Sequence, residues 1–248
     1  MFARTLTAAL FFATMAFASV PVAAQPAPSF TPQQRAEIVA VVREALQKDP
    51  SILRDAVIAL QADDGHRQTQ QQASTVAVLA SQIAHTPGDP VAGNPNGKIT
   101  VVEFFDVRCP FCRRMLPVVA SLLHDNPDVR LVYKDLPVLG PGSVLGARAL
   151  LAAQKQGGYQ KLHDALMTGP RDITEDSLHT AVAKVGLDWK KIQADMQSPD
   201  VLARIDSNLA LAKQLNLEGT PAYVIGTNVI PGAVSLTELQ QAVTEAKN

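Results

Sequence analysis

The sequence predicts a mixed α/β fold preceded by an N-terminal helical region. Strand-forming runs over residues 99–105 and 129–133 flank a segment with helical periodicity, and strand character returns at residues 222–225 and 229–230. Between them, residues 143–216 have a helical pattern throughout, with start signals at Thr174, Asp188 and Ser198. The order β-α-β, helices, β-β-α predicts a sheet domain over residues 91–248, with a helical insertion at about residues 142–218.

The first 24 residues have the pattern of a signal peptide. Arg4 supplies a positive start, residues 6–20 are largely apolar, and Val22-Ala23-Ala24 fits a small-residue cleavage site. The alternative is an uncleaved membrane anchor, because the apolar stretch is nearly long enough to span a bilayer. We expect cleavage after Ala24 and export to the periplasm, where disulfides persist.

Residues 25–90 predict a helical region and a linker. Thr31-Pro32-Gln33-Gln34 has the form of a capping box that opens a helix. Apolar residues then recur at helical spacing, and a glutamine cluster follows them within a helix-prone connector, residues 61–85; the apolar positions are Ile38, Val42, Leu46, Leu53, Val57 and Leu60. Short amphipathic helices cannot bury their apolar faces alone. Residues 31–84 therefore either form a stalk that joins copies of the chain or pack back onto the same chain.

Composition excludes some classes of partner. The chain has 248 residues, 47% hydrophobic content and a formal net charge of −1. This is ordinary for a globular protein, and there is no basic surplus of the kind that binds nucleic acid. We expect no nucleic-acid partner.

The only two cysteines, Cys109 and Cys112, stand two residues apart directly after a predicted strand. A zinc site lacks its second half, and c-type haem attachment needs a histidine where Arg113 stands. A structural disulfide around so short a loop would stabilise the fold only slightly. Cys109 at a helix N-terminus favours the thiolate, and Cys112 one turn later can resolve a mixed disulfide. Redox exchange is the favoured interpretation, with a structural disulfide and a metal site as alternatives.

The strand-Cys-Pro-Phe-Cys-helix pattern, the helical insertion and Gly219-Thr220-Pro221 before β-β-α together resemble the exported thiol-disulfide oxidoreductases of the DsbA family. That resemblance implies a thioredoxin fold from about Gly97 to the C-terminus. The stretch "FTPQQRAEIVAVVREAL" further resembles the leader of the suppressor-of-copper-sensitivity C proteins within this family.

The resemblance also implies roles for individual residues. Cys109 is the exposed nucleophile and Cys112 the buried resolving thiol, so the redox-active disulfide replaces any cofactor or metal. Pro221 is the cis-proline that presents backbone to substrate, and Thr220 before it tunes the couple. Glu103 is a buried acid that relays the proton of the second cysteine, the alternative being a strand residue that faces solvent.

Pro110 and Phe111 fill the middle of the motif and belong to the expected substrate-binding residues. Phe111 stands where strongly oxidising members carry histidine, and it cannot donate a hydrogen bond to a thiolate, so we expect an intermediate potential. Arg108, Arg113 and Arg114 either raise the local positive potential or are solvated surface charges.

Three functional hypotheses follow from these residues. The chain is a monomeric oxidase of exported proteins, or an oligomeric isomerase or reductase kept reduced by an unknown membrane partner. The third is a metal-handling module whose two thiolates bind Cu(I).

Overall fold

The structure is a computed structural model, and it describes residues 30–247. The expected signal peptide, residues 1–24, lies outside the described residues. Packing divides the chain into two units, Met1–Leu60 and Gln61–Asn248. The larger unit contains the whole sheet and both cysteines, and the smaller one is described separately below.

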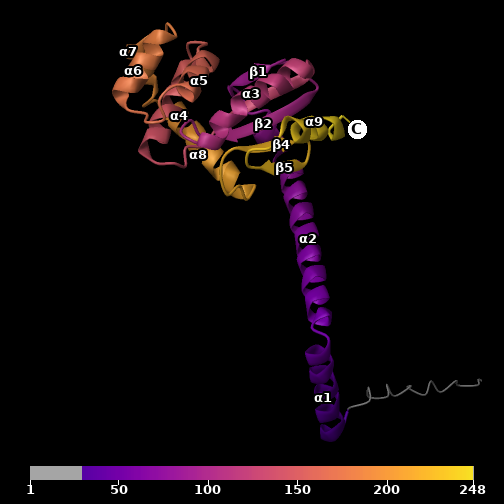
Figure 1. The fold of residues 1–248 in the computed structure, drawn as a ribbon. Helices are drawn as coiled ribbons and strands as arrows, with labels where there is room; N and C mark the ends of the chain where they lie inside the picture. Colours follow the sequence, from indigo (N-terminus) through magenta and orange to yellow (C-terminus); the bar gives the residue numbers. More distant parts are fainter. Residues whose placement is uncertain (1–29, 248) are drawn as a thin grey trace, which may run out of the picture. The chain divides into compact units, whose positions relative to one another are not determined.

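The larger unit is built on a five-stranded sheet in the order β1-β3-β2-β4-β5 (Figure 1). Its strands are β1 (Val91–Gly93), β2 (Ile99–Phe105), β3 (Val129–Asp135), β4 (Ala222–Ile225) and β5 (Asn228–Pro231). The central strands β2 and β3 are parallel, while β4 runs antiparallel to β2 and β5 antiparallel to β4. The predicted fold class, β-α-β and β-β-α around a helical insertion, is confirmed.

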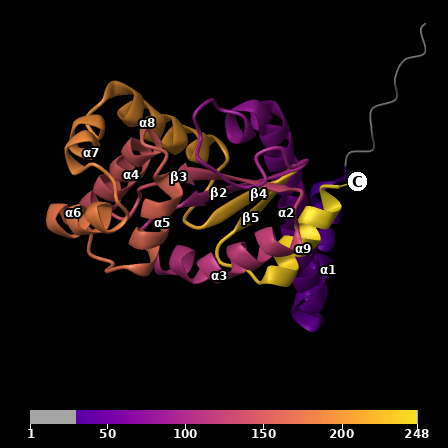
Figure 2. The ribbon, with the colours of Figure 1, turned by 90° about the horizontal axis from the view of Figure 1, so that it is seen from above.

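Side chains alternate between the two faces of this sheet, as a period of two requires. On β2, Val101 and Phe105 belong to one hydrophobic cluster, whereas Val102 and Phe104 belong to the other. The first cluster includes α3 (Pro110–Asp125) and α9 (Leu236–Glu245), which contact each other (Figure 2). Because α3 begins directly after Cys109, this face positions the cysteine pair.

The helical insertion lies between β3 and β4. It comprises α4 (Pro141–Gln154), α5 (Tyr159–Thr168), α6 (Glu175–Lys184), α7 (Trp189–Asp195) and α8 (Pro199–Gln214). Helix α4 contacts α5, α6, α7 and α8, which is why its alanine-rich core face is buried. The insertion therefore packs around one central helix.

The second face of the sheet is covered by the C-terminal part of α2 (Ser51–Ala84). Val76, Leu79 and Ile83 are buried there, in the same cluster as Val102 and Phe104. The expected domain boundary near Val91 differs from this packing, since residues 61–90 belong with the sheet. A domain that began at Val91 would expose the apolar side of β2.

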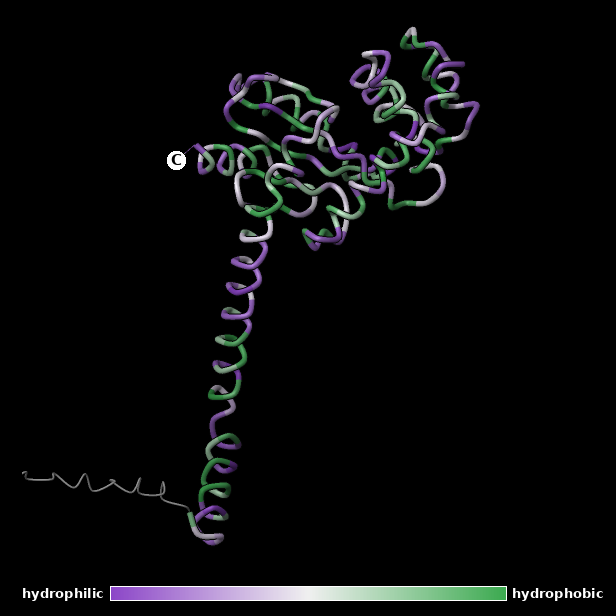
Figure 3. Tube along the Cα trace, turned by 180° about the vertical axis from the view of Figure 1, so that it is seen from behind, coloured by the Kyte–Doolittle hydropathy of each residue, from purple (hydrophilic) through white to green (hydrophobic). Residues whose placement is uncertain are grey.

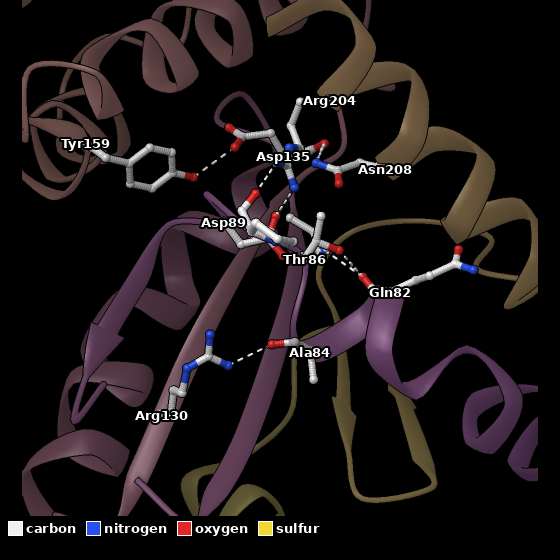
Figure 4. Close-up of polar contacts among 11 residues, drawn as sticks. Gln82, Ala84, Thr86, Asp89, Arg130, Asp135, Tyr159, Arg204 and Asn208 are labelled. Atoms are coloured by element: carbon white, nitrogen blue, oxygen red, sulfur yellow. Dashed lines mark hydrogen bonds and ion pairs between the residues drawn. The ribbon is translucent and has the colours of Figure 1, made fainter. Parts of the chain in front are cut away.

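Two basic residues of β3 fix the end of α2 (Figure 4). Arg130 donates to the carbonyl oxygen of Ala84 at 2.7 Å, and Lys134 donates to that of Gln82 at 3.0 Å. Cations favour the last carbonyls of a helix, which have no partner inside it. Buried Asp89 then pairs with both Lys134 and Arg204 at 2.6 Å. This part of α2 is thus anchored to the sheet by charge as well as by apolar contact.

The smaller unit contains α1 (Pro32–Lys48) and the first turns of α2. The predicted capping box is present, with Thr31 accepting from the Gln34 backbone and Gln34 from the Thr31 backbone. Helix α1 has no buried residue, and the predicted apolar stripe is exposed, including Ile38, Val42, Leu53, Val57 and Leu60. Figure 3 shows hydrophobic residues here and hydrophilic ones in the glutamine-rich middle of α2. Among residues 30–247, no helix is long and apolar enough to span a membrane.

Candidate active site

Cys109 is the N-cap residue of α3, and Pro110 occupies the first turn. The first N–H groups of a helix have no partner within it and stabilise negative charge. The pKa of Cys109 is lowered to about 5, chiefly by a hydrogen bond with the Cys112 thiol. The Thr220 side chain and the N–H groups of Cys112 and Phe111 lower it further, while burial opposes them. These contacts favour the thiolate form of Cys109.

Cys112 lies one turn into α3 and is buried. Burial raises the pKa of its thiol far above the ordinary value, and the neighbouring Cys109 raises it further. Both cysteines are free thiols in this structure. The pair thus combines one sulfur that ionises readily with one that retains its proton.

The surroundings of Cys109 differ from the sequence-based expectation of an exposed nucleophile. The exposed fraction of Cys109 is 4%, so that expectation is wrong in this respect. In its protonated form the thiol donates to the Thr220 carbonyl oxygen at 3.1 Å, so the sulfur lies against the loop that leads into β4. Phe111 beside it is 49% exposed, with the Arg114 guanidinium 4.4 Å from its ring centroid. The nucleophile is thus recessed beside an exposed aromatic side chain.

Pro221 and Thr220 face the cysteine pair from the loop that leads into β4. The Thr220–Pro221 peptide bond is cis. Pro221 is buried, and its carbonyl oxygen accepts from Gly232 at 2.8 Å. The structure therefore places Thr220 against Cys109, with a cis peptide bond between Thr220 and Pro221.

Glu103 lies in β2 with a side chain that is almost fully buried, so it does not face solvent. Burial raises the pKa of its carboxyl group to about 7. Tyr223, its partner across β2 and β4, donates to Glu103 Oε1 at 3.0 Å and partly offsets that rise. The charge of Glu103 in turn raises the pKa of Cys112. Tyr223 was not predicted, although its position two residues after Pro221 places it on the same face as Glu103.

Three further residues fix the loop that carries the cysteines. Buried Asp106 accepts from the Arg108 N–H and the Ser143 hydroxyl, both at 2.8 Å. Arg113 donates to the Val107 carbonyl at 2.9 Å and also to carbonyls at the end of α5, those of Leu166 and Gly169. The Arg108 side chain donates to the carbonyl oxygens of Leu139 and Arg171, at 2.7 and 3.2 Å, so both arginines are hydrogen-bonded to neighbouring segments of the chain.

The cysteine pair offers two sulfur ligands to a metal ion. Among residues 30–247, no group of three or more His, Cys, Asp or Glu side chains could hold a metal ion. Two thiolates could bind Cu(I). The raised pKa of Cys112 opposes formation of the second thiolate.

The fold and the site together define a class of protein. A thioredoxin-type sheet, a Cys-x-x-Cys pair at a helix N-terminus and a facing cis-proline are the features of a thiol-disulfide oxidoreductase. The family model of the DsbA-like thioredoxin domain matches residues 100–244, more than half of the chain. The chain belongs to this DsbA-like family.

Solved structures agree with this assignment. A thioredoxin-like oxidoreductase from Silicibacter pomeroyi is 44% identical, with a TM-score of 0.66 over 67% of this chain and 96% of that one. ScsC from Proteus mirabilis, in a transitional conformation, is 29% identical, with a TM-score of 0.64 over 88% of this chain and 97% of that one. The second likeness extends beyond the sheet domain into the N-terminal helices.

Curated relatives share only part of their length with this chain. The Na⁺/H⁺ antiporter NhaA 3 from Salinispora tropica is 28% identical over 160 residues, which are 64% of this chain and 24% of the antiporter. The chain thus spans about a quarter of that relative. Ion transport, the activity in its name, is not assigned to this chain.

Proposed function

We propose that this chain is an exported thiol-disulfide oxidoreductase that exchanges disulfides with protein substrates through Cys109-Pro110-Phe111-Cys112. The observation that supports this most is the contrast between the two sulfurs. Cys109 has a pKa lowered to about 5 at a helix N-terminus, while Cys112 is buried with a raised pKa. Only one of the two is a nucleophile and good leaving group at neutral pH.

In the oxidising direction, a substrate thiolate attacks Sγ of Cys109 in the Cys109–Cys112 disulfide. The S–S bond breaks, and Cys112 leaves as a thiolate and takes a proton. A second substrate thiolate then attacks the substrate sulfur of the mixed disulfide, and Cys109 leaves. The substrate gains a disulfide, and its two electrons remain on the enzyme as the Cys109 thiolate and the Cys112 thiol.

Glu103 is the proposed proton donor to Cys112. A thiol with a strongly raised pKa is a poor leaving group unless a proton reaches it. With a pKa of about 7, the Glu103 carboxyl group exchanges protons near neutral pH. Its role is limited to the second sulfur, because Cys109 is already ionised.

Oxidase and isomerase activities share this first step and differ in the resting state of the pair. Acid-quenched alkylation in cells tests this directly: mostly disulfide identifies an oxidase, and mostly dithiol an isomerase or reductase.

A Cys112→Ala variant should trap mixed disulfides with exported proteins. If this variant traps none while the wild type binds Cu(I) through both cysteines, metal handling is the better account.

We also propose that copies of the chain assemble through residues 31–60, within the predicted stalk of residues 31–84. The exposed apolar side chains of α1 and the start of α2 need a partner, and a second copy offers the same stripe. Light scattering on residues 25–248 and on a chain that begins at Gln61 tests this. Loss of an oligomer in the shorter chain supports the stalk, and two monomers contradict it. Periplasmic localisation and a membrane redox partner remain predictions.

A further inference from the structure

A groove adjoins the cis-proline between α2 and the turn that precedes β4. Its volume is about 520 Å³, and it lies entirely within residues 61–248. Thr220 and Pro221 line one end of it. Cys109 does not line the groove itself, but its sulfur lies 3.1 Å from the carbonyl oxygen of Thr220, a residue that does.

One wall of the groove is the glutamine-rich segment of α2. Gln68, Gln71, Gln72 and Thr75 line it, and their spacing places them on one helix face. Gln72 Nε2 donates to the Leu215 carbonyl oxygen at 3.0 Å, which fixes this wall to the opposite one. Gln70 belongs to the same cluster but does not line the groove. The glutamines are thus divided between a groove face and an outer face.

The other wall is the turn between α8 and β4, residues 214–219. Asn216 adopts a left-handed backbone conformation here, with φ of 58°. The following N–H, that of Leu217, donates to the Ala212 carbonyl at 2.9 Å, so the turn is fixed to the end of α8. Glu218 is the only charged residue among those that line the groove. The groove is therefore formed before any ligand arrives.

The chemistry of this lining suits a polypeptide backbone. Each glutamine or asparagine amide offers both donors and an acceptor, as does each peptide unit of an extended chain. Because Glu218 is the one charged residue in the lining, the groove shows no preference for an ionic ligand. A substrate whose cysteine reacts at Cys109 must place its neighbouring residues beside Thr220.

We propose that this groove binds the extended segment next to the substrate cysteine, through backbone hydrogen bonds to the glutamine face of α2 and with little sequence preference. This inference rests on the proposed function, because it needs a substrate bonded to Cys109. It extends the substrate site from the thioredoxin sheet onto the N-terminal region. Gln68 and Gln71 are then positioning residues for substrate.

The test compares two reductants of the oxidised full-length protein: an uncharged peptide with two cysteines, and dithiothreitol. Each gives two electrons to the Cys109–Cys112 disulfide and becomes a disulfide itself. Replacing both Gln68 and Gln71 by alanine should lower the peptide rate constant about five- to tenfold. The dithiothreitol rate should stay the same, and the matched Gln70→Ala variant should change neither.

Two results with the double alanine variant would overturn the proposal that the groove binds substrate. One is an unchanged peptide rate, and the other is an equal loss with both reductants, which indicates a structural effect. If the wild type reacts with neither reductant, the proposed function itself fails, so the two failures are distinguishable. A charge substitution gives a second readout. Gln71→Lys should raise the preference for an acidic over a basic peptide about threefold, and more than Gln70→Lys does. Equal changes at the two positions would contradict the proposal.

Discussion

Two carboxyl groups, Glu103 in β2 and Asp135 at the end of β3, are alike in their burial and in having a tyrosine as hydrogen-bond donor. Both are buried, and each accepts one tyrosine hydrogen bond, from Tyr223 at 3.0 Å and from Tyr159 at 2.9 Å. Burial raises the pKa of Glu103 to about 7 and that of Asp135 to about 8. By burial and pKa alone, either could be a functional acid.

The residues around each carboxyl group distinguish the two. Glu103 acts electrostatically on Cys112, whereas the charges of Asp89 and Asp106 act on Asp135. The backbone oxygen of Asp135 accepts from the Asn208 amide (Figure 4). Asp135 Oδ1 has no hydrogen-bond partner among the described residues. A perturbed pKa therefore identifies a candidate, and proximity to the reacting sulfur assigns the role.

The largest expected difference is in reaction rate. Glu103→Gln should slow reduction of the enzyme disulfide by a dithiol peptide about 100-fold at neutral pH, because Cys112 then leaves without a proton donor. Asp135→Asn should leave this rate within about twofold of the wild type. Stopped-flow or quenched alkylation measures both. Equal losses in the two variants would remove the distinction between the carboxyl groups.

The next difference is in the pH dependence of stability. Between pH about 4 and about 8, folded Asp135 holds a proton that the unfolded chain has lost, so this group makes stability fall as pH rises. Asp135→Asn should remove a slope of about 1.4 kcal/mol per pH unit from the free energy of unfolding. Urea unfolding of wild type and variant at several pH values measures it. Parallel curves would show that Asp135 is ionised in the folded protein.

A smaller effect distinguishes the two tyrosines. Tyr223→Phe removes the hydrogen bond that lowers the pKa of Glu103, so that pKa should rise by up to about one unit. The pH midpoint of the dithiol reaction should move upward with it. Tyr159→Phe is the matched control and should leave the midpoint unchanged. A shift with Tyr159→Phe, or none with Tyr223→Phe, would contradict the assignment of Glu103.

The sequence predicted what local patterns encode. The spacing of Cys109 and Cys112 after a strand, the capping box at Thr31 and the helical insertion each depend on neighbours in the chain. The sequence did not predict contacts between segments that are far apart in the chain. The stripe Val76, Leu79 and Ile83 shows that a helix is amphipathic but not which surface it covers.

The same limit explains the differences at the site. Cys109 is recessed because Thr220, more than a hundred positions away, contacts its sulfur. Arg113 binds carbonyls of α5 for a similar reason. No pattern in the sequence predicts the hydrogen bond between Asp135 and Tyr159.

The proposed chemistry depends on Cys109 being a thiolate nucleophile in a recessed but reachable site. The rate of iodoacetamide alkylation of Cys109 in the reduced, folded protein, measured against pH with the labelled peptide identified by mass, tests it most directly. We expect an inflection at about pH 5, with Cys112 unlabelled at every pH. An inflection at about pH 8.5, the value of an ordinary thiol, or no labelling of Cys109 before unfolding, would contradict it.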